Sequence, residues 1–113
     1  MEQNLIQKKI AEMVKRIRAQ FDPEKVVLFG SHARGTANHD SDVDLLVIKK
    51  NIGSKRRIRL EIRQALHGIG ISKDIVVATP EEVNKYQNVV GTIIRPALRD
   101  GIVLYDKTSN PNE

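Results

Sequence analysis

The chain has 113 residues, of which 40% are hydrophobic and 29% charged, a balance that is typical of one globular domain and not of a disordered protein. It has no cysteine, which excludes disulfides and thiolate metal sites and favours the cytoplasm, and no apolar run is long enough to span a membrane. The net charge of +5 favours a polyanion, a nucleotide or an acidic protein surface as partner.

The first half of the chain predicts one helix and two strands. Apolar residues recur at helical spacing from Leu5 to Ala19, and Asp22-Pro23-Glu24 ends this helix because proline and the residue before it resist continued helix. The apolar run Lys25–Phe29 predicts a buried strand, and Val43–Ile48 predicts a second. Between these strands, residues 33–41 have the composition of a turn.

The next segment predicts a helix, a third strand and a second helix start. Ser54 is a suitable N-cap for a helix whose apolar residues share one face, and Gly68 or Gly70 can end it. Residues 71–78 read as the third strand. Thr79-Pro80-Glu81-Glu82 then carries a capping box, with threonine at the cap and a glutamate placed to reach back to the cap amide.

The last segment predicts a further helix and a short strand. Gly91 is expected to interrupt the helix that follows Thr79, and Gly101 to close a further helical segment before a strand at Ile102–Tyr105. Residues 106–113 lack periodicity and are expected to fray, so residues 1–105 form the domain. The apolar side of the further helical segment consists of Val89, Val90, Ile93, Ile94, Ala97 and Leu98.

Three aspartates on two expected strands indicate a metal site. Asp42 and Asp44 alternate along the second strand and point the same way, about 6.6 Å apart. Carboxylates at that spacing can bracket two magnesium ions about 4 Å apart. Asp74 is the expected third ligand, because it is the only acid in an otherwise apolar strand that should lie beside the second.

Ordinary structural explanations of these aspartates remain open. A turn would explain Asp42, but not Asp44, which continues directly into an apolar strand where an unpaired charge is expensive to bury. Asp74 could be an edge-strand charge or a partner for Lys73 or Arg63.

The turn after the first strand has the groups that a phosphate needs. Gly30 permits close backbone approach, and Ser31 can offer its hydroxyl and amide groups, although a plain strand-ending turn is the alternative. Arg34 either contacts phosphate or pairs with Asp40 or Asp42 as a structural brace. His32 and His39 receive no role. Together with the aspartates, this turn predicts metal-dependent transfer from a nucleotide.

A basic run follows the second strand. It could hold RNA, a triphosphate or an acidic partner, but a solvated helix face is the commonest explanation. Nucleic acid is not favoured, because the chain has only four aromatic residues on which bases could stack. The run consists of Lys49, Lys50, Lys55, Arg56, Arg57 and Arg59.

Gly30-Ser31, ten intervening residues and Asp42-Val43-Asp44 resemble the signature of the DNA polymerase beta-like nucleotidyltransferase superfamily. The chain is similar in size, in Ala33-Arg34-Gly35 and in Asp74 to the smallest members, the minimal nucleotidyltransferase (MNT) domains. The resemblance covers about residues 1–105. It implies an α/β (α+β) fold in which helices flank a small mixed β-sheet.

The resemblance also implies a reaction and roles for the residues. A nucleoside monophosphate is transferred from a triphosphate, here ATP, with two Mg²⁺ ions and release of pyrophosphate. Asp42 and Asp44 are implied to bind both metals, and Asp74 to bind the catalytic metal and help deprotonate the attacking hydroxyl. Gly30 and Ser31 are implied to hold the triphosphate.

The acceptor is expected to belong to another protein. Larger relatives carry an additional acceptor-binding domain, for which this chain has no room. Many MNT proteins act as antitoxins that attach AMP to a tyrosine of a HEPN-domain ribonuclease toxin, and the resemblance implies such an antitoxin. Two alternatives remain: an antitoxin that acts by binding alone with an idle metal site, and an enzyme that modifies a small molecule or an RNA end.

Overall fold

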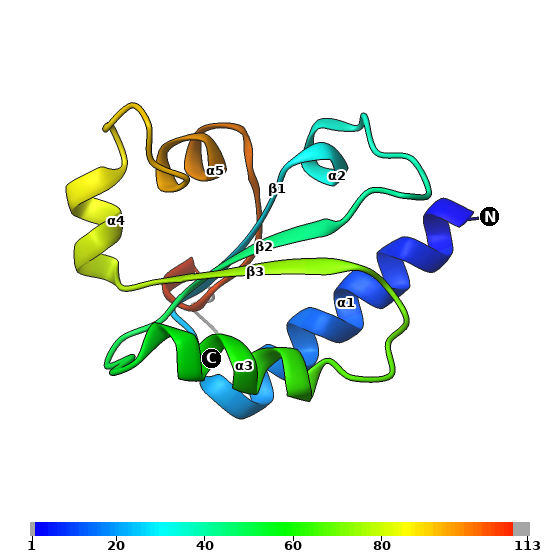
Figure 1. Ribbon diagram of the computed structural model, residues 1–113, viewed down its shortest axis with the longest axis horizontal. Helices are drawn as coiled ribbons and strands as arrows, with labels where there is room; N and C mark the ends of the chain where they lie inside the picture. Colours follow the sequence, from blue (N-terminus) through cyan, green and yellow to red (C-terminus); the bar gives the residue numbers. More distant parts are fainter. Residues whose placement is uncertain (1, 110–113) are drawn as a thin grey trace.

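A four-stranded mixed β-sheet forms the centre of the molecule (Figure 1). The structure, a computed structural model, describes residues 2–109. Its strands are β1 (Lys25–Phe29), β2 (Val43–Ile48), β3 (Lys73–Ala78) and β4 (Ile102–Asp106), in the order β3-β2-β1-β4. β1 is antiparallel to β2 and β4, whereas β2 and β3 are parallel. The mixed sheet implied by the resemblance is confirmed.

Five α-helices flank this sheet within the described part of the chain. α1 (Glu2–Phe21) and α3 (Lys55–Ala65) cover one face, and α4 (Pro80–Tyr86) and α5 (Ile94–Asp100) lie over the other. α2 (Ser31–Arg34) is one turn of helix at the end of β1. No helix within residues 2–109 combines the length and apolar character needed to cross a lipid bilayer.

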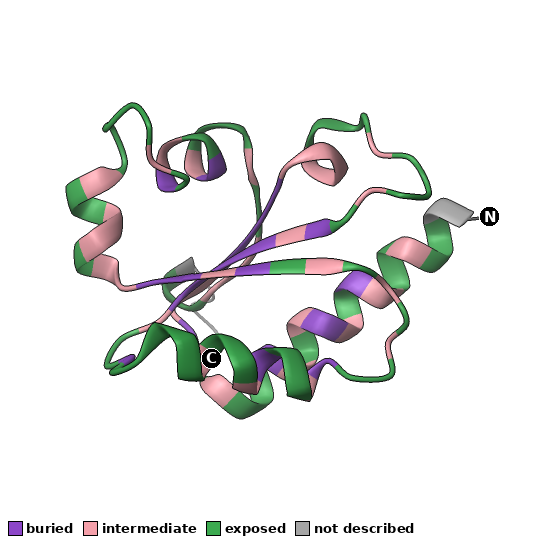
Figure 2. Cartoon of the chain, in the orientation of Figure 1, coloured by how far each residue is buried: buried purple, intermediate pink, exposed green. Residues whose placement is uncertain are grey.

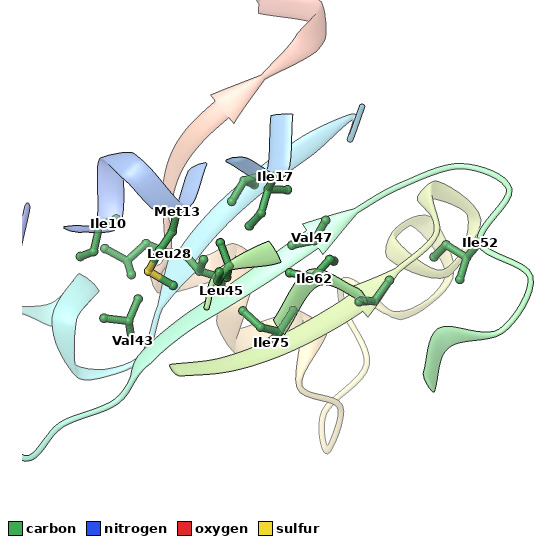
Figure 3. Packing of buried hydrophobic residues seen from close by; sticks show 13 residues of the cluster. Ile10, Met13, Ile17, Leu28, Val43, Leu45, Val47, Ile52, Ile62 and Ile75 are labelled. Atoms are coloured by element: carbon green, nitrogen blue, oxygen red, sulfur yellow. The ribbon is translucent and has the colours of Figure 1, made fainter. Parts of the chain in front are cut away.

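Side chains from α1 and α3 form the larger core on one face of the sheet (Figure 3). Met13, Ile17 and Ile62 are fully buried, as the helical spacing of the apolar residues predicts. Figure 2 shows the same division, with exposed outer helix faces and buried strands. The buried members of this cluster are Ile10, Met13, Ile17, Val26, Leu28, Val43, Leu45, Val47, Ile52, Ile62, Leu66, Ile75 and Val77.

A smaller core lies beneath α5 on the opposite face. Ile94 and Ala97 pack there with the strand residues whose side chains alternate away from the first core. The sheet therefore presents apolar side chains to both layers, which is why its strands read as continuous apolar runs. The buried members of this cluster are Val27, Phe29, Leu46, Ile48, Ala78, Ile94 and Ala97.

The strands and helix caps follow the sequence closely, with small shifts. β1 and β2 have the expected bounds, and β3 begins at Lys73 rather than residue 71. Ser54 caps α3 by accepting a hydrogen bond from the Arg57 amide. α1 begins earlier and ends later than expected, and Ala33 and Arg34, expected in a turn, lie in α2.

The prediction that Val89, Val90 and Ile93 lie on the apolar side of a helix is wrong. They are 43%, 79% and 50% exposed, and α5 begins only at Ile94. The backbone turns here instead: Gly91 has φ +96°, and the Thr92 hydroxyl donates to the Val89 carbonyl at 2.9 Å. Local turn chemistry therefore overrides the apolar spacing.

The last strand also extends further than expected. Asp106 belongs to β4, and residues 107–109 form a single 3-10 turn instead of a frayed end. The Lys107 amide donates to the Glu24 carbonyl at 2.9 Å, and its ammonium group contacts Asp22 at 3.1 Å. The rest of the expected tail, residues 110–113, lies outside the described residues.

Three cations of the basic run form ion pairs within the fold. Lys50 approaches Glu24 at 3.7 Å and Arg57 approaches Glu61 at 3.1 Å. Lys55 pairs with Glu82 and thereby links α3 to the start of α4. These contacts account for part of the run without a nucleic-acid partner.

Replacement of Thr79 tests the capping box that begins α4. The Thr79 hydroxyl accepts from the Glu82 amide at 3.1 Å, while the Glu82 carboxylate accepts from the Thr79 amide at 3.0 Å. Thr79→Ala is expected to lower the free energy of unfolding by about 1 kcal/mol in urea denaturation, because the Glu82 amide loses its acceptor. Thr79→Ser keeps the hydroxyl and should stay near wild type; equal stability of the alanine variant would contradict the cap.

Candidate active site

The structure brings the three sequence-predicted aspartates to one end of the sheet. Asp44 on β2 and Asp74 on β3 are direct partners across the parallel pair, whose strands lie about 4.8 Å apart. Asp44 shares its strand face with Leu46, so its side chain lies on the side that α4 and α5 partly cover. Asp42 immediately precedes β2 and is close enough for its charge to act on Asp44.

The environment of Asp44 disfavours its charged form. The pKa of Asp44 is raised from its ordinary value, first by burial and then by the negative charges of Asp74 and Asp42. Positive charge on His32 and Arg34 acts in the opposite direction but does not cancel these effects. The fold therefore stabilises a half-buried carboxylate poorly, and a nearby cation would relieve that cost.

Gly30 provides the space into which the Asp44 side chain fits. A Cβ atom at position 30 would lie 2.1 Å from Oδ2 of Asp44, far inside van der Waals contact. Gly30 also has φ +75°, a conformation that residues with side chains rarely adopt. Two independent constraints thus require glycine at this position.

α2 places Ser31 and Arg34 beside the carboxylates. Gly30 is the N-cap residue of this turn of helix, and its carbonyl accepts hydrogen bonds from the Ala33 and Arg34 amides at 3.1 Å. Ser31 is half-buried and Arg34 is exposed. The brace considered for Arg34 is not seen: within residues 2–109 it forms no ion pair, and Asp40 instead approaches His39 at 3.5 Å.

His32 also belongs to this site, although no role is predicted for it from sequence patterns. Its Nε2 lies 3.3 Å from the Ser41 carbonyl oxygen, so it connects α2 to the residue before Asp42. Its charge also reaches Asp44. No spacing rule points to a contact between a loop histidine and a backbone atom nine positions away, and only its place beside Ser31 could have drawn attention to it.

The aspartates are gathered on one side but do not form a closed ligand cage. Among residues 2–109, no three acidic or histidine side chains stand close enough together to hold one metal ion. Asp74 is exposed on an edge strand, which agrees with the alternative that it is an edge-strand charge. Within the described residues it forms no ion pair with Lys73 or Arg63, the other alternative.

Comparison with known proteins identifies the family. The family model described as polymerase beta, nucleotidyltransferase matches residues 8–110. The chain belongs to this nucleotidyltransferase family. It is also 30% identical to a Methanocaldococcus jannaschii protein provisionally named protein adenylyltransferase MJ1305, over 95% of this chain and 76% of that protein. The chain is accordingly a nucleotidyltransferase, as Gly30-Ser31 and Asp42-Val43-Asp44 predict.

Further relatives share part of the sequence or the fold. The protein adenylyltransferase MntA of Thermococcus cleftensis is 36% identical over 56% of this chain, a match that spans 64% of that protein. A crystal structure of a provisionally assigned Sulfolobus solfataricus nucleotidyltransferase superposes with TM-score 0.67 at 21% identity, covering 95% of this chain and 87% of that one. A toxin-antitoxin crystal structure with AMP-PNP gives 0.64 at 20% identity, covering 93% and 77%. Both confirm the nucleotidyltransferase fold.

The contact between Gly30 and Asp44 can be measured by comparing two glycines. Gly30→Ala is expected to lower the free energy of unfolding by about 2 to 4 kcal/mol, because the methyl group meets the Asp44 carboxylate in addition to the strain of positive φ. Gly35→Ala is the matched control: it has φ +77° and open space around the new carbon, so strain alone should cost it about 1 kcal/mol.

A double-mutant cycle supplies the decisive readout for this contact. In an Asp44→Ala background the additional cost of Gly30→Ala should disappear, since the clashing atoms are gone. Equal costs for the two glycine substitutions in the wild-type background would refute the close approach.

Asp44→Asn tests the cost of the carboxylate. In metal-free buffer at pH 7 this variant is expected to melt a few degrees above wild type, because a raised folded-state pKa means that ionised Asp44 opposes folding. Wild type regains this stability as the pH falls through the raised pKa, so the difference should shrink near and below the ordinary value of 3.8. Asp40→Asn, in the exposed turn, is the control and should change little; a lower melting temperature for Asp44→Asn would contradict the expectation.

Proposed function

We propose that this nucleotidyltransferase is an antitoxin that transfers AMP from ATP to a tyrosine hydroxyl of a HEPN-domain ribonuclease toxin in the cytoplasm. The observation that carries the proposal is the register of Asp44 with Asp74 beside the close approach of Gly30. This arrangement places carboxylates beside the Gly30-Ser31 turn at one end of the sheet. The names of the relatives, protein adenylyltransferases, support AMP as the group and a protein as the acceptor.

The nucleotide is assigned to the β1 side of the carboxylates. Gly30 lets the Asp44 carboxylate lie against the turn, and Ser31 next to it offers a hydroxyl and an amide to phosphate oxygens. Arg34 is exposed without an ion pair in the described residues, so its guanidinium group is available to a phosphate. These three residues form the proposed triphosphate site.

The donor set of the site suits magnesium. Asp42, Asp44 and Asp74 supply carboxylate oxygens, which Mg²⁺ prefers. Burial, and then the negative charges of Asp74 and Asp42, raise the pKa of Asp44, and a nearby cation would favour its charged form. Asp42 and Asp74 are exposed and free to turn toward a shared ion. Two Mg²⁺ ions, when bound, supply charge neutralisation for the phosphates and lower the pKa of the acceptor hydroxyl.

The proposed transfer is a single displacement at the α-phosphorus of ATP. The acceptor oxygen forms a bond to this phosphorus while the bond to the oxygen that bridges toward the β-phosphorus breaks, and pyrophosphate leaves. The hydroxyl proton passes to the Asp74 carboxylate. Gly30 and Ser31 hold the leaving pyrophosphate in line with the attacking oxygen. Because the displacement needs this alignment, the protein contributes to the reaction mainly by positioning the two groups.

Labelled ATP tests the reaction and the role of Asp44 together. With MgCl₂ and a HEPN toxin from the same genome, wild type is expected to place α-phosphate label on the toxin, and Asp44→Asn should reduce the rate at least 100-fold. Mg²⁺ with ATP should also raise the melting temperature of wild type, and Asp44→Asn should weaken this rise. An undiminished rise in the variant would mean that Asp44 is not a ligand.

Two results would overturn the proposal and identify an alternative. Suppression of toxicity with no label on the toxin, equally by wild type and Asp44→Asn, would show an antitoxin that acts by binding alone. Label on an RNA end or a small molecule, with none on the toxin, would show a different acceptor. Toxin in which the modified tyrosine is replaced by phenylalanine is the control for the acceptor hydroxyl.

A further inference from the structure

A hollow in the surface adjoins Asp42, one of the three aspartates of the site. It measures about 640 Å³ and lies where the segment between α3 and β3 meets the start of β2. Figure 1 shows that segment at the same end of the sheet as the start of β2 and β3. The hollow, here called the α3–β3 cleft, is lined by Asp42, Arg63, Gly70, Ile71, Ser72 and Lys73.

The wall of the α3–β3 cleft is fixed by hydrogen bonds from α1. Lys9 donates to the Gly70 carbonyl at 3.0 Å, and Arg16 donates to the carbonyls of Ala65 and His67 at 3.1 and 3.0 Å. Strand pairing continues at its inner end, where the Val43 amide donates to the Ser72 carbonyl at 2.9 Å. These hydrogen bonds therefore fix the position of the segment that forms the cleft wall.

Two cations of the cleft are not neutralised by the chain itself. Within residues 2–109 neither Arg63 nor Lys73 forms an ion pair, although Arg57 on the same helix pairs with Glu61. Lys73 donates to the Ile71 carbonyl at 3.0 Å, which orients its ammonium group but leaves its charge unbalanced. The cleft thus offers two positive charges to an anionic segment, against the one negative charge of Asp42 at its end.

The sheet order fixes the side from which an acceptor must come. The triphosphate is assigned to Gly30 and Ser31 at the end of β1, and β3 lies on the other side of β2. In-line displacement requires the attacking oxygen to approach opposite the leaving pyrophosphate. That direction is the β3 side, where the α3–β3 cleft ends at Asp42.

The lining favours a peptide over a nucleic acid. Bases bind to protein surfaces largely by stacking on aromatic rings, and no aromatic residue lines the cleft. Ile71 suits an apolar side chain of a peptide, and the two cations suit acidic side chains.

We propose that the α3–β3 cleft docks the acceptor as an acidic peptide segment, held by Arg63 and Lys73 with its hydroxyl group directed toward Asp42 at the end of the cleft. This inference rests on the proposed AMP transfer. It adds a specificity site that distinguishes acidic from basic acceptor segments, and it makes Arg63 and Lys73 positioning residues for the acceptor.

Equilibrium binding of synthetic peptides tests the docking without the reaction. The probes are fluorescent peptides with one tyrosine flanked by glutamates or by lysines, and a five-nucleotide RNA, measured by anisotropy at low salt without ATP. The glutamate peptide is expected to bind most tightly, and the double variant Arg63→Glu with Lys73→Glu should weaken it at least about tenfold. Lys15→Glu, an exposed charge reversal on α1 outside the cleft, is the matched control and should leave binding unchanged.

The outcomes separate the docking site from the reaction. Three results would each overturn the docking site. The double variant could bind the glutamate peptide as tightly as wild type, or wild type could bind RNA more tightly than this peptide. The double variant could also lose the rise in melting temperature that Mg²⁺ and ATP cause, which would mean that the substitutions disturb the nucleotide site. The double variant could instead lose peptide binding alone, while wild type transfers no AMP to peptide or toxin. That result would support the docking site and overturn the proposed function. The single variant Arg63→Glu controls for misfolding, because Arg63 is exposed and its replacement should not disturb the fold. It should lose less affinity for the glutamate peptide than the double variant.

Discussion

The parallel pairing of β2 with β3 is the constraint on which the site depends. Its register places Asp44 opposite Asp74, and side chains alternate along both strands. A slip of one residue would turn Asp74 toward α3 and bring Lys73 to the carboxylate face instead. The apolar residues that follow, Ile75 and Val77 toward one core and Ala78 toward the other, make such a slip costly because they would exchange faces.

Much of this arrangement follows from sequence patterns of short range. The bounds of β1 and β2, the Ser54 cap and the capping box at Thr79 all depend on neighbouring residues, so spacing and residue type suffice to predict them. The adjacency of Asp74 and Asp44 was also predictable, because one acid in an apolar strand needs a particular explanation.

The features that the sequence missed depend on contacts between distant segments. The exposure of Val90 depends on a turn organised by Thr92, and the apolar spacing alone resembles a helix. The contact of His32 with Ser41 depends on how two loops meet. Lys9 and Arg16 donate hydrogen bonds to carbonyl groups about 50 or 60 positions away, in the segment around the end of α3. Patterns among neighbouring residues cannot predict such contacts.

The position of β4 has a consequence for how the molecule is made. This strand pairs with β1 over about 80 positions of chain, whereas the strands that bear the carboxylates are complete by Ala78. During synthesis the sheet edge beside β1 stays open until β4 emerges, and that pairing closes the largest loop of the fold. The pairs β1–β2 and β2–β3, which position the carboxylates, therefore close shorter loops than the pair β1–β4.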